Sequence, residues 1–279
     1  RSIMARMSNS WAMLKASATV LRLDTELLIF PLLSTLAVIL ITVSLVALIM
    51  FFGGPEALDD PGYLVYSGGF VFYLILYTII FFFNAGLVGA TLIRLDGGDP
   101  TVGDGMNIAT KKLPTILGYA VIAATVGMVL RAIEERVGAL GRIVVGLIGM
   151  SWSLTTYLTV PVLVSKDVGA FDAVKKSASL FRRTWGEQVV GNAGIGLATF
   201  LLFALMTAVG VPLVILVSSI NEAFAIPMWI TLGVGYFFLA LLSAALQGIY
   251  SAALYRFATT GDAGEHFNAA MMDQAFRPK

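Results

Sequence analysis

Six apolar stretches, each long enough to cross a lipid bilayer, constrain this chain more than any other feature. A helix needs roughly 18 to 20 mostly apolar residues to span the hydrocarbon core. Each stretch meets that length, and charged residues are nearly absent from all of them. The sequence therefore predicts an all-α polytopic membrane bundle of six transmembrane helices. The stretches are Leu27–Phe52, Tyr63–Ile93, Leu113–Leu130, Ile143–Ser165, Gln188–Ser218 and Ala225–Phe257.

Composition agrees with a membrane location. Hydrophobic residues make up 58% of the chain and charged residues 13%, whereas about a quarter of a soluble domain is charged. The chain has no cysteine, which excludes disulfides, thiolate metal sites and cysteine nucleophiles. The stretch from Leu27 is too long for the apolar part of a signal peptide, so we expect it to remain as the first span.

Basic residues indicate the orientation of the spans. Of the 18 Lys and Arg residues, 15 fall before the first, third and fifth spans or after the sixth. Because positive charge is retained on the cytoplasmic side, we expect both termini of this multi-pass membrane protein in the cytoplasm. The discordant loop Arg131–Arg142 has apolar residues at helical spacing. We expect it to cap or to extend the third and fourth spans outside the membrane.

A short amphipathic segment precedes each odd-numbered span, and we call these segments elbows. The first and third elbows match at an offset of 160 residues, and the middle elbow, Val102–Lys112, matches only weakly. Basic amphipathic segments are common before any span, so a chance likeness stays open for the middle elbow. The matching polar and small residues are Lys15, Ser17, Ala18 and Arg22 with Lys175, Ser177, Ala178 and Arg182. The matching apolar residues are Trp11, Leu14, Ala18 and Leu21 with Phe171, Val174, Ala178 and Phe181.

This repeat predicts three helical hairpins, each preceded by an amphipathic interfacial helix. All three belong to one transmembrane domain that covers residues 1–279. The hairpin units span about residues 10–93, 100–165 and 170–257, and a cytoplasmic tail covers 258–279.

Residues for several kinds of chemistry are missing from the spans. The 17 acidic residues lie in loops, elbows or the tail, so the spans lack the ionisable group that proton- and sodium-coupled transporters usually keep at depth. The single histidine, His266, lies in the tail without the three or four convergent ligands of a metal site. We expect no catalytic residue, no metal, no cofactor and no enzymatic activity.

Uncharged polar residues lie at a similar depth in the spans, on the order of 10 to 15 Å below the cytoplasmic surface at 1.5 Å per residue. Two interpretations stay open. These residues line a polar pocket, or they hydrogen-bond between helices and contribute about 1 kcal/mol or less each. They are Ser34, Thr35, Asn84, Tyr119, Thr159, Asn192 and Gln247.

Residues 159–197 carry a resemblance to a known family through the segments TVPVLV, AVKKSASLFRRTWGE and GNAGIGL. The chain resembles six-span prokaryotic integral membrane proteins of unknown function. More distantly, it is similar to the membrane domain of some glycerophosphodiester phosphodiesterases. The resemblance implies a prokaryotic plasma membrane and supplies no catalytic residues. The soluble phosphodiesterase domain, with its acidic metal ligands, has no counterpart in this chain, which argues against hydrolysis.

Lipid is the favoured ligand from the sequence. We expect a non-enzymatic protein that binds, organises or helps move lipid, with anionic phospholipids as partners and no nucleic acid. A homo-oligomer or a partner membrane protein is compatible with the sequence. The alternatives are a passive channel or transporter for a small solute, and a scaffold for partner proteins. The expected headgroup ligands are Lys15, Arg22, Lys175, Lys176, Arg182 and Arg183. The third elbow is expected to anchor through Phe171, Val174, Phe181 and Trp185.

Overall fold

The computed structural model describes residues 2–53, 63–185, 194–264, 266 and 267, and these residues contain helices and no strand. Side chains are described for 11–52, 68–182, 199–264, 266 and 267. Six helical spans are long and apolar enough to cross a membrane, which confirms the all-α, six-span class. The elements are α1 Ser2–Leu23, η1 Thr25–Leu28, α2 Ile29–Gly53, α3 Tyr63–Leu95, α4 Val102–Lys111, α5 Leu113–Glu134, α6 Ala139–Thr156, α7 Thr159–Ser165, α8 Ala170–Trp185, α9 Gly194–Ile220, η4 Glu222–Phe224 and α10 Ala225–Thr260.

The fourth span is broken into two helices, α6 and α7. Pro161 has no N–H to donate to the carbonyl of Tyr157, so the helix is interrupted there. The expected extension of the third and fourth spans is confirmed, since α5 continues to Glu134 and α6 begins at Ala139. Pro212, by contrast, lies inside α9 without ending it.

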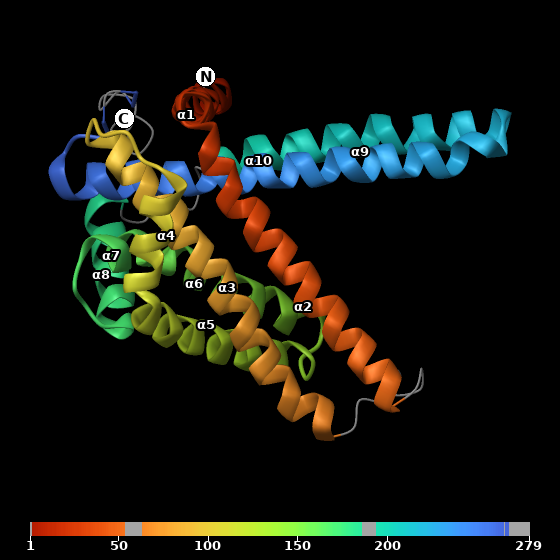
Figure 1. Cartoon of the computed structure of the whole chain (residues 1–279), viewed down its shortest axis with the longest axis horizontal. Coiled ribbons are helices and arrows are strands. Elements are labelled where there is room, and N and C mark those ends of the chain that lie inside the picture. The colour runs from red at the N-terminus through yellow and green to blue at the C-terminus, as the bar shows by residue number, and fades with distance from the viewer. Residues whose placement is uncertain (1, 54–62, 186–193, 265, 268–279) are drawn as a thin grey trace.

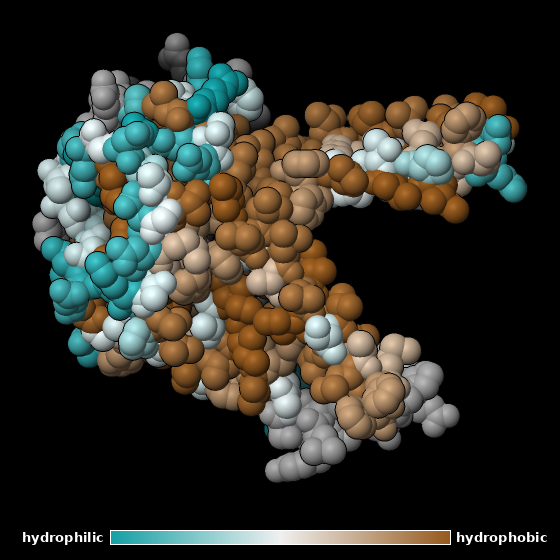
Figure 2. All heavy atoms as spheres, viewed as in Figure 1, coloured by the Kyte–Doolittle hydropathy of each residue, from teal (hydrophilic) through white to brown (hydrophobic). Residues whose placement is uncertain are grey.

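Three hairpins extend from one end of the molecule, as Figure 1 shows: α2 with α3, α5 with the broken span α6–α7, and α9 with α10. We call this end the head, and it comprises α1, α4, α7, α8 and the adjoining ends of α3 and α10. Figure 2 shows hydrophilic residues gathered over the head and hydrophobic ones covering the hairpins that leave it. In Figure 1, α1 is viewed nearly along its axis while α2, α9 and α10 lie across the view. It therefore crosses the spans at a steep angle, as a helix in the membrane plane would.

The tightly packed core lies in the head. A run of α3 from Ala85 to Thr91 is buried, and so is most of α10 from Leu241 to Tyr255. The fully buried ring of Phe30 closes over the point where α3 meets α4. A Cβ added to Gly105 there would lie 2.6 Å from the carbonyl oxygen of Gly86, so only glycine permits this approach.

Each elbow packs against a hairpin other than its own. The middle elbow α4 packs on α3, the third elbow α8 packs on α5, α6 and α7, and the first elbow α1 packs on α9 and α10. Each therefore lies on the preceding hairpin in the chain, and the first elbow closes the cycle by lying on the last hairpin. This arrangement joins the three units at the head and fixes one face of every elbow.

Candidate functional site

The first and third elbows share a buried face at three matching positions. Buried side chains of α1 at Met13, Leu14 and Ser17 correspond to Ala173, Val174 and Ser177 of α8 at the offset of 160. Small or apolar groups on that face lie against the neighbouring hairpin. The repeat seen in the sequence is therefore also a repeat of packing.

The opposite face of each elbow is free and carries an aromatic, a lysine and an arginine. Positions i, i+4 and i+11 fall within an arc of about 40° on a helix of 3.6 residues per turn, so the three side chains share one face. Trp11 is 61% exposed and Phe171 is 62% exposed. The basic residues are exposed as well. The two sets, which we call the elbow faces, are Trp11, Lys15 and Arg22 on α1, and Phe171, Lys175 and Arg182 on α8.

The apolar residues of α8 do not form the single lipid-facing stripe that the sequence predicted. Val174, expected to anchor in lipid, is buried against the bundle. Phe171 stays exposed, and the ammonium of Lys175 lies 4.5 Å from the centre of its ring. Lys176 is exposed but lies about 100° further around the helix. The side chains of Arg183 and Trp185 fall outside the described ones.

An exposed aromatic ring beside a cation suits the boundary between acyl chains and headgroups. Aromatic rings are enriched at that level of a membrane, while the long stems of Lys and Arg let their charges reach the aqueous side. A phosphodiester is the anion that such a pair of charges would meet there. Each elbow face is therefore a candidate site for a lipid headgroup, so the chain has two such sites.

The polar residues expected to line a pocket are placed in several environments. Gln247 lies on the exposed face of α10. Asn84 is half-buried on α3 next to Gly248 of α10, while Ser34 and Thr35 are half-buried on α2. The hydroxyl of Thr35 donates to the carbonyl of Pro31 in its own helix, at 2.7 Å. Asn192 lies outside the described residues.

Two of these residues, Tyr119 and Thr159, do come together at the break in the fourth span. Tyr119 is buried, stacks on Phe81 with ring centres 4.4 Å apart, and lies beside the hydroxyls of Thr156 and Thr159. The Thr159 hydroxyl is fully buried and lacks a hydrogen-bond partner of good geometry among the described residues. These two expected pocket residues and Thr156 therefore form a small cluster of hydroxyl groups around the break.

Ser177 of the third elbow hydrogen-bonds to backbone groups at the break in the fourth span. Its hydroxyl donates to the carbonyl of Thr155 at 2.6 Å and accepts from the N–H of Leu158 at 3.1 Å. These are backbone groups that an unbroken helix would satisfy within itself. Sequence reasoning noted Ser177 only as a repeat position, and its pairing with Ser17 at the offset of 160 was the available signal.

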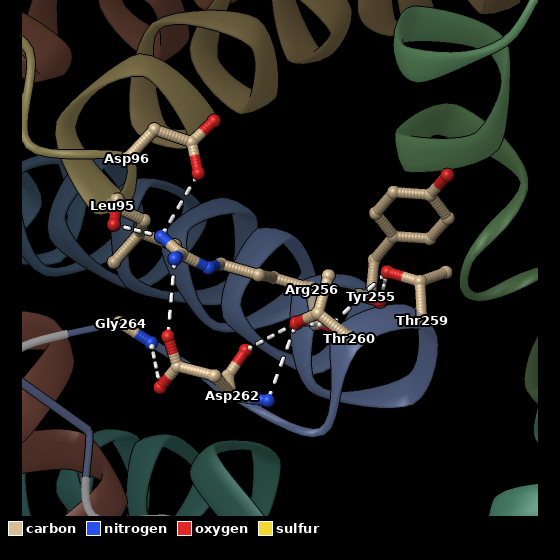
Figure 3. Close-up of polar contacts among 8 residues, drawn as sticks. All are labelled: Leu95, Asp96, Tyr255, Arg256, Thr259, Thr260, Asp262 and Gly264. Atoms are coloured by element: carbon tan, nitrogen blue, oxygen red, sulfur yellow. Dashed lines mark hydrogen bonds and ion pairs between the residues drawn. The ribbon is translucent and has the colours of Figure 1, made fainter.

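A network of ion pairs joins the helix ends in the head. Arg256 of α10 donates to the carbonyl of Leu95 and pairs with Asp96 at 3.0 Å and with Asp262 at 3.1 Å. Figure 3 shows its guanidinium between these two carboxylates. A parallel contact occurs at the end of α7, where Lys112 donates to the carbonyl of Lys166 at 3.0 Å.

The same Lys112 forms an ion pair with Asp167 at 2.6 Å, and this contact lowers the pKa of the Asp167 carboxyl. In the second elbow, the hydroxyl and N–H of Thr101 hold the pKa of Asp104 below its usual value through a capping box. Both carboxylates are therefore ionised at neutral pH. Asp167 pairs with Lys112, and Asp104 caps the start of α4. Among the described residues, no group of three His, Cys, Asp or Glu side chains is arranged to hold a metal.

Comparison with known protein families gives a match over most of the chain. The family described as "Family of unknown function (DUF6159)" matches residues 62–267, well over half of the 279 residues. The chain belongs to DUF6159. This confirms the expected membership of a family of unknown function. No curated protein and no solved structure matches the chain. The distant likeness to phosphodiesterase membrane domains stays a prediction.

Within this DUF6159 chain, the matched region covers α3 to α10, and with them the second and third elbows. The first elbow and α2 precede the matched region. The residues that sequence reasoning missed are charged ones at helix ends, Asp24, Arg94 and Arg256, of which it counted Arg94 and Arg256 only for orientation. Their position close to the ends of apolar spans was a signal, because charges there need partners or water.

Proposed function

We propose that this protein is a non-enzymatic plasma-membrane protein of prokaryotes that binds and organises anionic phospholipid through its elbows. Both termini would lie in the cytoplasm, so the elbow faces would meet the anionic inner leaflet. The observation that carries the proposal is the exposed aromatic, lysine and arginine on one free face of both α1 and α8.

The physical argument rests on two attractions that act together. A basic residue near a negatively charged membrane surface contributes about 1 kcal/mol to binding. An exposed aromatic ring on the same face gains from leaving water for the acyl boundary. A helix that carries both on one side, and packs on the protein with the other, is held at the headgroup level.

Native mass spectrometry of protein purified with phosphatidylglycerol and phosphatidylcholine tests the proposal. The wild type should retain phosphatidylglycerol in preference. Replacing the expected headgroup ligands by glutamine should abolish that preference, and those ligands are Lys15, Arg22, Lys175, Lys176, Arg182 and Arg183. The variant R136Q/R142Q is the control, since both residues are exposed in or next to the α5–α6 connection, at the far end of that hairpin. An unchanged preference in the glutamine variant contradicts the proposal.

The broken fourth span favours a second candidate function, passage of a small solute. Discontinuous helices with free polar groups form substrate sites in many transporters. Here the break brings Tyr119 and the buried Thr159 hydroxyl together. If the site carries solute, Y119F and T159V should abolish flux in proteoliposomes at unchanged melting temperature. If these variants mainly lower the melting temperature, the hydroxyl groups serve packing.

A further inference from the structure

The two elbow faces carry the same types of residue at equivalent positions, and the middle elbow lacks such a face. On α4, the buried residues Gly105 and Ala109 are four positions apart, as are Ala173 and Ser177 on α8. The acidic residues that precede them, Asp104 and Asp172, also coincide. The three elbows can therefore be compared position by position.

The comparison shows what the middle elbow is missing. Gly103 stands where α8 has Phe171, and Asn107 stands where it has Lys175. Pro114, the counterpart of Arg182, already belongs to the following span. All three are exposed, so these positions are free but carry neither an aromatic ring nor a charge, and the exposed Lys111 of α4 lies one turn beyond Asn107. Packing of the middle elbow is preserved while its chemistry toward an anion is absent.

We infer that the chain holds two anionic phospholipids in equivalent sites, one on each elbow face, and none on α4. In each site the lysine and arginine bind the phosphodiester, and the aromatic ring lies at the glycerol and upper acyl level. This inference rests on the proposed function and adds the number, position and composition of the sites. Lys176 lies about 140° from Phe171 around the helix and is not part of the site.

The two elbows pack mainly on different hairpins. The first elbow packs on α9 and α10, whereas the third packs mainly on α5, α6 and α7, with a smaller contact to α10. Loss of one face therefore leaves the packing of the other unchanged. Each lipid should be lost separately, which a diffuse basic surface would not allow.

Counting bound phosphatidylglycerol by native mass spectrometry tests the inference. The wild type should hold two molecules in preference to phosphatidylcholine. The variants W11A/K15Q/R22Q and F171A/K175Q/R182Q should each hold one, and their combination none. Loss of two basic residues, at about fivefold each, should weaken the affected site about 30-fold. The control K111Q, which changes an exposed lysine of the middle elbow, should still hold two.

A transplant variant tests the composition of the site without removing anything. G103W/N107K gives the middle elbow the aromatic and the lysine of α8, and a Cβ at Gly103 meets only an ordinary contact with Thr101, at 3.5 Å. A third phosphatidylglycerol should then be retained, about fivefold more weakly than the other two because this face lacks the arginine. A count that stays at two would overturn the assignment of the site to these positions.

The remaining outcomes separate the inference from the proposed function. If the wild type shows no preference for phosphatidylglycerol, the proposed function fails. If the preference exists but is lost with K111Q, or falls gradually when any basic residue is removed, the inference fails while the function stands. Soluble glycerol 3-phosphate in excess should leave the count at two. Displacement of the lipid by it would overturn the role of the aromatic and acyl contacts.

Discussion

Arg94 at the end of α3 forms a bidentate ion pair with Asp24, which lies 70 residues earlier, between α1 and η1. Asp24 is only 7% exposed, and the Arg94 guanidinium also reaches Asp99. The pair ties the first elbow to the second span of its own hairpin, whereas α1 itself packs on the third hairpin. The pair therefore fixes α3 to the elbow that packs on the third hairpin.

Removal of either partner should destabilise the protein strongly. The variant R94Q leaves a buried carboxylate without its cation, and breaking such a pair costs about 3 kcal/mol or more. Melting of detergent-solubilised protein, followed by size-exclusion chromatography, measures the loss. The double variant D24N/R94Q should recover part of it, since neither charge is then left unpaired. A loss in the double variant equal to the sum of the losses in D24N and R94Q would show that the pair is not coupled.

The close approach of α3 and α4 predicts opposite effects for two glycines of α4. G105A should lower the melting temperature, because the added methyl group meets the carbonyl of Gly86 and the ring of Phe30. Overpacking of this kind costs about 1 to 3 kcal/mol. G103A, two residues earlier in an open position, should be neutral or stabilising by up to about 1 kcal/mol. A stable G105A would mean that the two helices are further apart.

The hydroxyl of Ser177 predicts a cost at the break of the fourth span. S177A leaves the carbonyl of Thr155 and the N–H of Leu158 without this partner, and a buried unsatisfied group costs about 1 to 3 kcal/mol. S179A, an exposed neighbour on the same helix, is the matched control and should melt like the wild type. The two variants melting alike would indicate that water satisfies the break.

The charge asymmetry predicts the sidedness of the membrane. Because the chain has no cysteine, single cysteines introduced at the exposed positions Ser179 and Glu222 can be labelled without background. An impermeant thiol reagent should label Ser179→Cys from the cytoplasm and Glu222→Cys from outside. Labelling of both from one side would overturn the six-span topology with cytoplasmic termini.

The sequence alone determined the class of this protein and the repeat of its first and third elbows. Span length and helical period are local properties, so six spans and the pairs Lys15 with Lys175 and Arg22 with Arg182 follow from residue order. The break at Pro161 also has a local cause, since proline lacks the N–H that the helix needs.

Only the tertiary structure decided which face of each helix is free. In a membrane protein the residues that face lipid and those that face the core are both apolar, so hydrophobicity does not separate them. Val174 and Phe171 are apolar neighbours on one helix, yet one is buried and the other exposed, because α8 packs on α5, α6 and α7 through its small residues. Gln247 is exposed and Thr159 buried for the same reason: their surroundings depend on contacts between segments far apart in the chain.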